Sequence, residues 1–132
     1  MKVSVTGLSR LNKAFSSYDK NKQGELRDLA NGSALTIETG AKERSPFDTG
    51  RLRSSVHAIP ANTTDNSFSY VDIKGQSHDG ATQVQTGELD AAVATNVEYA
   101  PKQERIHGFL NAAYEAEARH YQNRVAKAMK RL

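Results

Sequence analysis

The side chains in this sequence that most readily bind metals or move protons near neutral pH are four histidines. His57, His78, His107 and His120 lie far apart, and none falls in a metal-binding spacing. The chain has no cysteine, which excludes a thiolate metal site and a disulfide framework. The sequence also contains no nucleophile elbow, Walker loop or dinucleotide fingerprint. We therefore expect no catalytic, metal or cofactor site, and we expect that the protein is not an enzyme.

The most distinctive segment is the junction at residues 45–56, which reads SPFDTGRLRSSV. Pro46 disfavours the helical conformation in the residue before it and so ends a helix. Asp48 or Thr49 can accept backbone N–H bonds within a turn, and Gly50 supplies the conformational freedom for a sharp change of direction. The junction therefore predicts a turn that leads from a helix into a strand.

A second segment, TGELDAAV at residues 86–93, matches the same Thr-Gly-x-Leu-x-x-x-Val pattern. It carries Glu88 and Asp90 where the first copy carries Arg51 and Arg53. One interpretation is that common turn chemistry has produced an accidental match. The other is that an arginine of one subunit meets an acid of the next, in the head-to-tail manner that closes rings.

Apolar residues recur at helical spacing in three segments: residues 8–18, residues 26 to about 44, and residue 108 to the end. The last segment has the strongest signal, with Leu110, Tyr114, Ala118, Tyr121, Val125, Ala128 and Leu132 on one face. Three glycines, Gly24, Gly32 and Gly40, lie inside or beside the second segment. Each costs roughly 1 kcal/mol in a helix interior, which indicates either close approach of another element or a kink.

Four segments have the composition or alternation of strands, namely residues 2–5, 55–59, 67–73 and 91–99. The second and third are placed to pair as a hairpin, while residues 74–90 are polar and glycine-containing and predict a mobile loop. The expected fold is a single α+β domain over residues 1–132. It has two N-terminal helical segments, a small antiparallel sheet of three to four strands and a long C-terminal helix packed on the sheet.

The net charge of +3 permits contact with nucleic acid without requiring it. Positive charge gathers near the C-terminus at Arg119, Arg124, Lys127, Lys130 and Arg131, where cations also complement the dipole of a helix. This cluster is therefore either a solvated helix end or a nucleic-acid surface. The sequence shows no apolar run of signal-peptide or membrane-span length, so we expect synthesis in the cytoplasm.

The motifs, taken in order along the chain, resemble the tail-completion or tail-component family of long-tailed phages, which is related to the lambda minor tail protein Z. The matching residues are Val5, Gly7 and Leu8; Ala41 and Lys42; Pro46, Asp48, Thr49, Gly50, Arg51 and Leu52; Asn96, Val97, Tyr99 and Ala100; Glu104; and Phe109, Leu110, Ala112 and Ala113. The chain departs from the family between Ala100 and Phe109, where Glu-Phe-Gly is reduced to Gln-Glu-Arg and a proline is replaced by Gly108. The path of that stretch stays undetermined.

The resemblance implies a virion protein, assembled in the host cytoplasm, that forms a ring of six subunits in the neck or at the head-proximal end of the tail. Its partners would be other copies of itself, the connector or stopper, the tail terminator and the tail tube, and DNA would pass through its lumen without sequence-specific binding. The predicted subunit interface comprises Asp48, Thr49, Gly50, Arg51, Arg53, Glu88, Asp90, Tyr99, Glu104 and Phe109. Two alternatives stay open: a tail-terminator or head–tail joining role, and, more distantly, a small basic nucleic-acid-binding module.

Overall fold

The structure is a computed structural model that describes residues 3–5, 20–45, 50–64, 67–72, 74–81, 84–97 and 99–130. It confirms the expected α+β class. The elements are β1 (Val3–Val5), α2 (Lys20–Arg44), α3 (Arg51–Ser55), β2 (His57–Ile59), β3 (Ser67–Val71), β4 (Ser77–Ala81), β5 (Ala92–Thr95), α4 (Ala100–His107) and α5 (Phe109–Lys130). The predicted helix at residues 8–18 lies outside the described residues.

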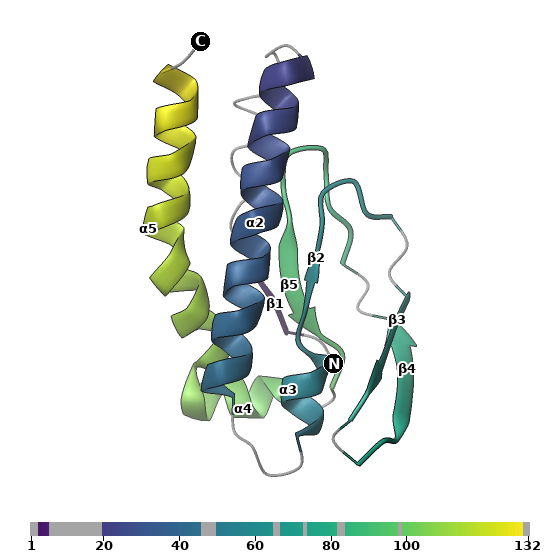
Figure 1. Ribbon diagram of the computed structural model, residues 1–132. Coiled ribbons are helices and arrows are strands. Elements are labelled where there is room, and N and C mark those ends of the chain that lie inside the picture. The colour runs from purple at the N-terminus through teal and green to yellow at the C-terminus, as the bar shows by residue number, and fades with distance from the viewer. Residues whose placement is uncertain are drawn as a thin grey trace.

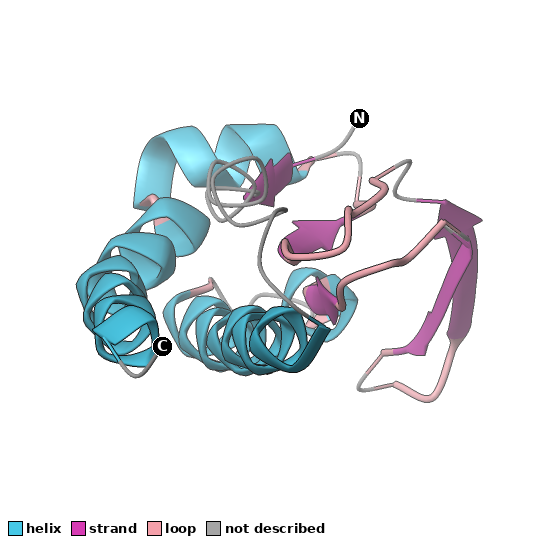
Figure 2. Ribbon diagram, turned by 90° about the horizontal axis from the view of Figure 1, so that it is seen from above, coloured by secondary structure: helices cyan, strands magenta, loops and turns pink. Residues whose placement is uncertain are grey.

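Two long helices form one side of the molecule, as Figures 1 and 2 show. α2 and α5 lie side by side and run in opposite directions, and an antiparallel sheet in the order β1-β5-β2 lies against them. β3 and β4 form a second, two-stranded antiparallel sheet that is set apart from the long helices α2 and α5 and lies beside the short helix α3 (Figure 1). The C-terminal helix packs most extensively on α2 and also contacts β1.

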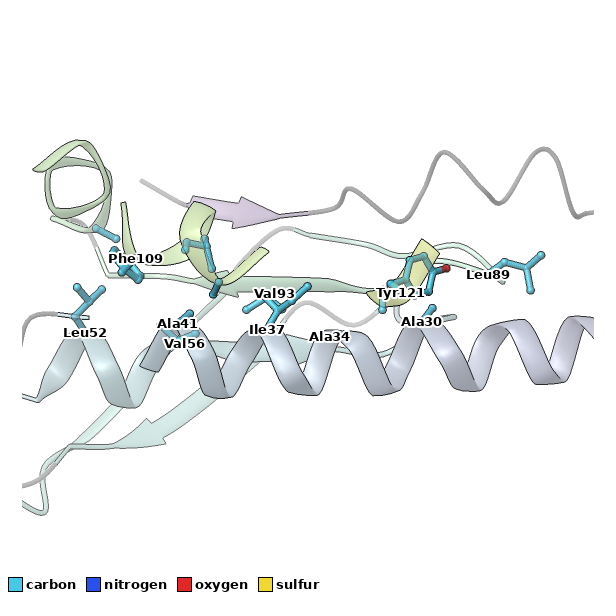
Figure 3. Packing of buried hydrophobic residues seen from close by; sticks show 14 of the residues in the cluster. Ala30, Ala34, Ile37, Ala41, Leu52, Val56, Leu89, Val93, Phe109 and Tyr121 are labelled. Carbon is cyan, nitrogen blue, oxygen red and sulfur yellow. The ribbon is translucent and has the colours of Figure 1, made fainter. Parts of the chain in front are cut away.

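The core is built from an alanine-rich stripe on α2 (Figure 3). The buried apolar residues of this helix, Leu26, Ala30, Ala34, Ile37 and Ala41, recur at intervals of three or four and so share one face. α5 contributes a matching buried stripe of Phe109, Leu110, Ala113, Tyr121, Val125 and Ala128. Leu110, Tyr121, Val125 and Ala128 belong to the stripe that the sequence periodicity predicts, whereas the predicted Tyr114 and Ala118 are only partly buried and Leu132 lies outside the described residues. Because small side chains dominate the α2 stripe, the second helix can approach closely.

One of the three α2 glycines marks that close approach. A Cβ built at Gly40 would lie 3.3 Å from the Cβ of Ala113 on α5 and 2.8 Å from Nη1 of Arg44. Among the described residues, the same construction at Gly24 and Gly32 meets nothing within 4 Å. The expectation of close approach is therefore confirmed at Gly40 and wrong at the other two, and α2 continues as a helix through all three.

The predicted hairpin between residues 55–59 and 67–73 is wrong, because β2 pairs with β5 and β3 pairs with β4. β4 occupies part of the segment that was predicted to be a mobile loop. The reason is a tight turn after β3, in which Oδ1 of Asp72 accepts hydrogen bonds from the backbone N–H groups of Lys74 and Gln76. Gly75 supplies a positive φ of 81° in the same turn, so the chain reverses at once and pairs with itself.

The predicted turn directly from Gly50 into a strand is also corrected. Gly50 adopts a left-handed conformation with φ of 72°, and its carbonyl oxygen accepts a hydrogen bond from the N–H of Ser54. The chain thus makes the short helix α3 before β2 begins at His57. This helical turn buries Leu52 and Ser55, which an extended strand would have placed on opposite faces.

The strand predicted at residues 91–99 is shorter in the structure and is buried on both faces. β5 ends at Thr95, whose hydroxyl accepts a hydrogen bond from the N–H of Val97. All four β5 residues are buried, because Val93 faces the main core while Ala92 and Ala94 pack with Ile59 in a second cluster. The alternation of larger and smaller residues along β5 therefore distinguishes two faces of the strand that are both buried, rather than a buried face from an exposed one. The undetermined stretch after Ala100 forms α4.

Candidate subunit interface

The predicted interface residues lie at two ends of the molecule. Asp48 and Thr49 lie outside the described residues. Figure 3 shows Leu52 and Phe109 at one end of α2 and Leu89 at the other. We name these the Arg51 end, which holds Gly50, Arg51, Arg53, Tyr99, Glu104 and Phe109, and the Glu88 end, which holds Glu88 and Asp90. Much of α2 separates the ends, at about 1.5 Å per residue, so a contact between Arg51 and Glu88 requires two chains.

Arg51 is half-buried and is held by two tyrosines of its own chain. Its Nε donates a 3.2 Å hydrogen bond to the hydroxyl of Tyr70 on β3. Its guanidinium carbon lies 5.9 Å from the centre of the Tyr99 ring, within range of a cation–π interaction. The structure therefore brings together two predicted interface residues, Arg51 and Tyr99, and adds Tyr70, which the sequence analysis did not single out.

Arg53 links α3 back to the end of α2. Its Nη2 donates a 3.3 Å hydrogen bond to the carbonyl oxygen of Ser45, the residue after α2. Together with the left-handed conformation of Gly50, this bond fixes the direction in which α3 leaves the junction. Arg53 thus has a structural role within the subunit.

Glu104 caps the N-terminus of α5. Its Oε2 and Oε1 accept hydrogen bonds of 2.9 Å each from the backbone N–H groups of Leu110 and Asn111. α4 ends in Gly108 with φ of 59°, whose N–H bonds back to the carbonyl oxygen of Glu104. The carboxylate therefore pairs two amide groups that a helix start leaves unpaired and complements the positive end of its dipole. Phe109, at the same corner, is fully buried in the core of its own subunit.

We predict that Glu104→Ala lowers the free energy of unfolding by about 1–3 kcal/mol, because two helix-terminal amide groups lose a charged acceptor. Urea unfolding followed by circular dichroism measures this change. Glu115→Ala, which removes an exposed carboxylate one turn into α5, is the matched control and should change stability by less than about 0.5 kcal/mol. Equal effects of the two substitutions would contradict the capping role.

At the Glu88 end, hydrogen bonds fix the turn that carries the acids. The hydroxyl of Thr86 donates to the carbonyl oxygen of Pro60 at 2.6 Å, and the N–H of Thr63 donates to the Thr86 hydroxyl at 3.0 Å. Asp90 is buried and accepts a hydrogen bond from the N–H of Gly87. Glu88 is exposed. Of the two predicted acids, it is therefore the one whose carboxylate lies at the surface.

The two copies of the Thr-Gly-x-Leu-x-x-x-Val pattern bury the same two positions, the leucine and the valine, but form different local structures. Leu52 and Leu89 are both buried, and so are Val56 and Val93. However, the first copy passes through the helix α3, whereas the corresponding residues 88–91 make a turn before β5. The pattern thus anchors each turn to the core at its own end of the molecule.

Sequence reasoning missed a stack of four rings between the body and the β3–β4 hairpin. The His57 and Phe68 rings are nearly parallel with centres 3.4 Å apart, and the stack continues to Tyr70 at 5.8 Å and from there to His78 at 5.0 Å. Alternation along β3 indicates that Phe68 and Tyr70 share a face. The positions of both histidines depend on strand pairing that local patterns do not reveal.

The α2–α5 surface carries a groove of about 400 Å³ lined by small residues, including Gly40 and Ala113, and by side chains of both charges. Within the described ranges, no three His, Asp or Glu side chains gather in an arrangement suited to a metal ion. None of the described helices combines the length and the apolar character needed to cross a bilayer.

Compared with protein-family models, with curated proteins and with solved structures, the chain matches none of them. The resemblance to phage tail-completion proteins therefore rests on the sequence motifs alone.

Proposed function

We propose that this protein is a structural subunit of a homo-oligomeric ring in the neck or tail-completion assembly of a tailed phage. The observation that carries the proposal is the placement of Arg51 and the exposed Glu88 at opposite ends of the subunit. A contact between unlike ends is heterologous, and repeating it generates a ring when the rotation closes. The order of the phage-like motifs along the chain supports the neck assignment and a ring of six.

In this role the subunit helps to join the tail to the head and encloses the passage of DNA. Its tasks are to contact its ring neighbours and the connector, tail-terminator or tail-tube proteins above and below. Such a part needs no catalytic residues or cofactor. A modest net charge of +3 suits a lumen through which DNA must slide, because tight binding to phosphates would oppose its movement.

Charge reversal at the two ends tests the proposal. We expect Arg51→Glu or Glu88→Arg alone to weaken assembly at least tenfold, because like charges then face each other across the contact. The double variant restores opposite charges in the reverse sense and should recover most of the assembly. Native mass spectrometry and light scattering over a range of concentrations measure the oligomer fraction.

Two controls separate the intersubunit contact from effects within the chain. Tyr70→Phe removes the hydrogen bond from Arg51 but keeps the arginine charge, so it should assemble like the wild type. Arg119→Glu reverses an exposed charge on α5, away from both ends of the predicted contact, and should also assemble. A folded double variant that stays as monomeric as the singles would rule out the pairing.

A nucleic-acid-binding module is the alternative from another class. Arg119, Lys127 and Lys130 are exposed on α5, and residues 118–130 contain no acid. This alternative predicts duplex binding by the monomer with a steep salt dependence. The ring proposal instead predicts co-purification with tail and connector proteins. Genes for portal, connector and major tail proteins beside this one would support the phage assignment, and their absence would count against it.

A further inference from the structure

The β3–β4 hairpin needs support from the rest of the molecule. A two-stranded sheet is marginally stable by itself in water, and this one is set apart from the long helices α2 and α5, although β3 contacts the short helix α3 (Figures 1 and 2). The ring stack provides a direct contact to the body, since His57 belongs to β2 while Phe68, Tyr70 and His78 belong to the hairpin. The bond from Arg51 to Tyr70 is a second link. Tyr70 is also buried in the main core cluster, and Phe68 packs against that cluster.

His57 is the titratable member of the stack on the body side. Its Nδ1 lies 2.9 Å from the carbonyl oxygen of Ser55, so in the neutral ring this nitrogen carries the proton and donates it. Burial lowers the pKa of His57 from its ordinary value of 6.5, since a protonated ring covered by Phe68 loses hydration. The neutral form is therefore the one that fits the docked hairpin.

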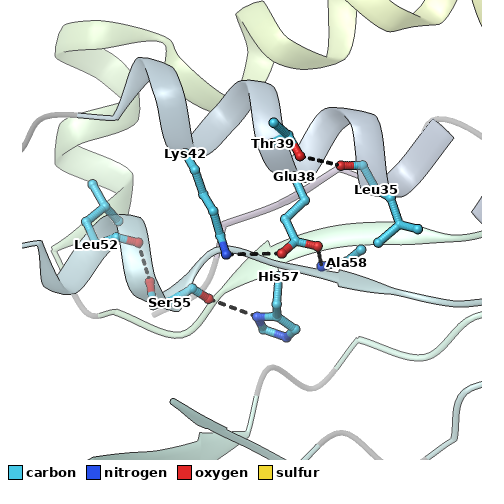
Figure 4. Close-up of polar contacts among 8 residues, drawn as sticks. All are labelled: Leu35, Glu38, Thr39, Lys42, Leu52, Ser55, His57 and Ala58. Atoms are coloured by element: carbon cyan, nitrogen blue, oxygen red, sulfur yellow. Dashed lines mark hydrogen bonds and ion pairs between the residues drawn. The ribbon is translucent and has the colours of Figure 1, made fainter. Parts of the chain in front are cut away.

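The charged neighbours of His57 come from α2. Figure 4 shows Glu38 and Lys42 beside it, joined by a 3.1 Å ion pair, and Glu38 also accepts a hydrogen bond from the N–H of Ala58. Glu38 raises the pKa of His57 and Lys42 lowers it, and both effects are smaller than that of burial. Among the described residues, the uncharged Ala94 of β5 pairs with His57 in the sheet, and the uncharged Phe68 of β3 stacks on its ring.

The hairpin has its own means of staying folded in mild acid. Nε2 of His78 lies 2.8 Å from Oδ2 of Asp72, and the hydroxyl of Ser69 bonds to Asp79 across the two strands. The hydrogen bonds from His78 and from the backbone N–H of Gln76 hold the pKa of Asp72 below its usual range. Asp72 thus stays charged in mild acid and continues to accept these hydrogen bonds.

We propose that the β3–β4 hairpin is a proton-controlled arm, which docks on the body while His57 is neutral and detaches as a folded unit when His57 takes up a proton. The released ring regains water, so it binds the proton more tightly than the docked ring does. Docking is therefore strongest above pH 6.5 and weakens by up to about tenfold for each pH unit below it, until the docked ring itself titrates.

Because the chain has no cysteine, a labelled pair can report the movement. Thr39→Cys on α2 and Ser77→Cys on β4 are both exposed positions for nitroxide labels. Double electron–electron resonance should give a narrow distance distribution at pH 7.5 and a broader, longer one at pH 5.0, reversibly and with unchanged far-ultraviolet circular dichroism. His57→Phe keeps a stacking ring without a titratable group, so its distribution should stay narrow at both pH values.

Two results would overturn the proposal: a wild-type distribution that stays narrow at pH 5.0, or a His57→Phe variant that broadens as the wild type does. If His57→Phe does not fold, the nuclear Overhauser effect between the His57 and Phe68 rings in the wild type decides. We expect this nuclear Overhauser effect to vanish at pH 5.0 while the contacts between β3 and β4 remain. If it persists at pH 5.0, the proposed detachment of the hairpin is wrong. Neither measurement depends on ring assembly, so the proposal stands or falls independently of the proposed function.

Discussion

Phe109→Ala should lower the free energy of unfolding by about 3–5 kcal/mol, the range typical of emptying a well-packed aromatic site. Phe109 is 0% exposed and is the largest of the fully buried side chains among the described residues. It begins α5 and shares the main core cluster with Leu52 and Ala41, so its loss opens a cavity where three elements meet (Figure 3). A domain of this size is stable by roughly 5–15 kcal/mol, so the variant should be much closer to unfolding.

Urea unfolding with a fitted slope measures the change. Ile106→Ala is the matched control, since Ile106 lies three residues earlier, has a similar apolar character and is 62% exposed. It should cost less than about 0.5 kcal/mol. The contrary outcome would be a Phe109→Ala variant that is as stable as the wild type but fails to assemble, which would make Phe109 the interface residue that the sequence resemblance implied.

Helix positions could be predicted from the sequence because the signal for burial is local. Three-to-four spacing along α2 and α5 reports which side chains face the core, and both helices lie where that spacing places them. The same spacing does not say what covers a buried face. The sequence could therefore identify the apolar stripe of α5 without revealing that α2 is its principal neighbour.

Strand pairing was less predictable because it depends on partners far along the chain. The strand-like run at β3 was recognised, but its partner was not, since β4 reads Ser-His-Asp-Gly-Ala and has no apolar alternation. A hydrogen-bonded turn around Asp72 creates that strand pair. The sequence contains the residues that form this turn, but β4 lacks the hydrophobic alternation that would have identified it as a strand.

The predicted interface set shows a related limit. Family motifs mark positions that matter without distinguishing intersubunit contacts from internal ones. Glu104 caps a helix, Phe109 fills the core and Asp90 closes a turn, all within one chain. The proposed contact between subunits therefore rests on Arg51 and Glu88, which lie at opposite ends of the molecule, with Glu88 exposed.

The second large effect concerns a carboxylate beneath the α2–α5 surface. Glu117 has a side chain that is 5% exposed, and its Oε2 lies 2.5 Å from Nη2 of Arg124. Arg124 also donates a 3.4 Å hydrogen bond to the hydroxyl of Ser33 on α2. Arg124→Ala should therefore lower the free energy of unfolding by about 2–3 kcal/mol, because it leaves a buried charge without its partner. The expected loss of stability is smaller than for breaking a fully buried ion pair, because the side chain of Arg124 is 45% exposed.

Replacing both charged residues at once distinguishes a buried pair from a surface one. Glu117→Leu with Arg124→Leu removes both charges and should be close to wild type in stability, since apolar replacement of a buried pair is often neutral. Arg119→Ala, on the exposed face of the same helix, is the control and should change little. Adding 1 M salt screens exposed charges but reaches buried ones poorly, so the cost of Arg124→Ala should persist at high salt. If the loss of stability in Arg124→Ala falls to that of the control, Glu117 and Arg124 behave as an ordinary surface ion pair. The contact between α2 and α5 would then depend on alanine-rich packing instead.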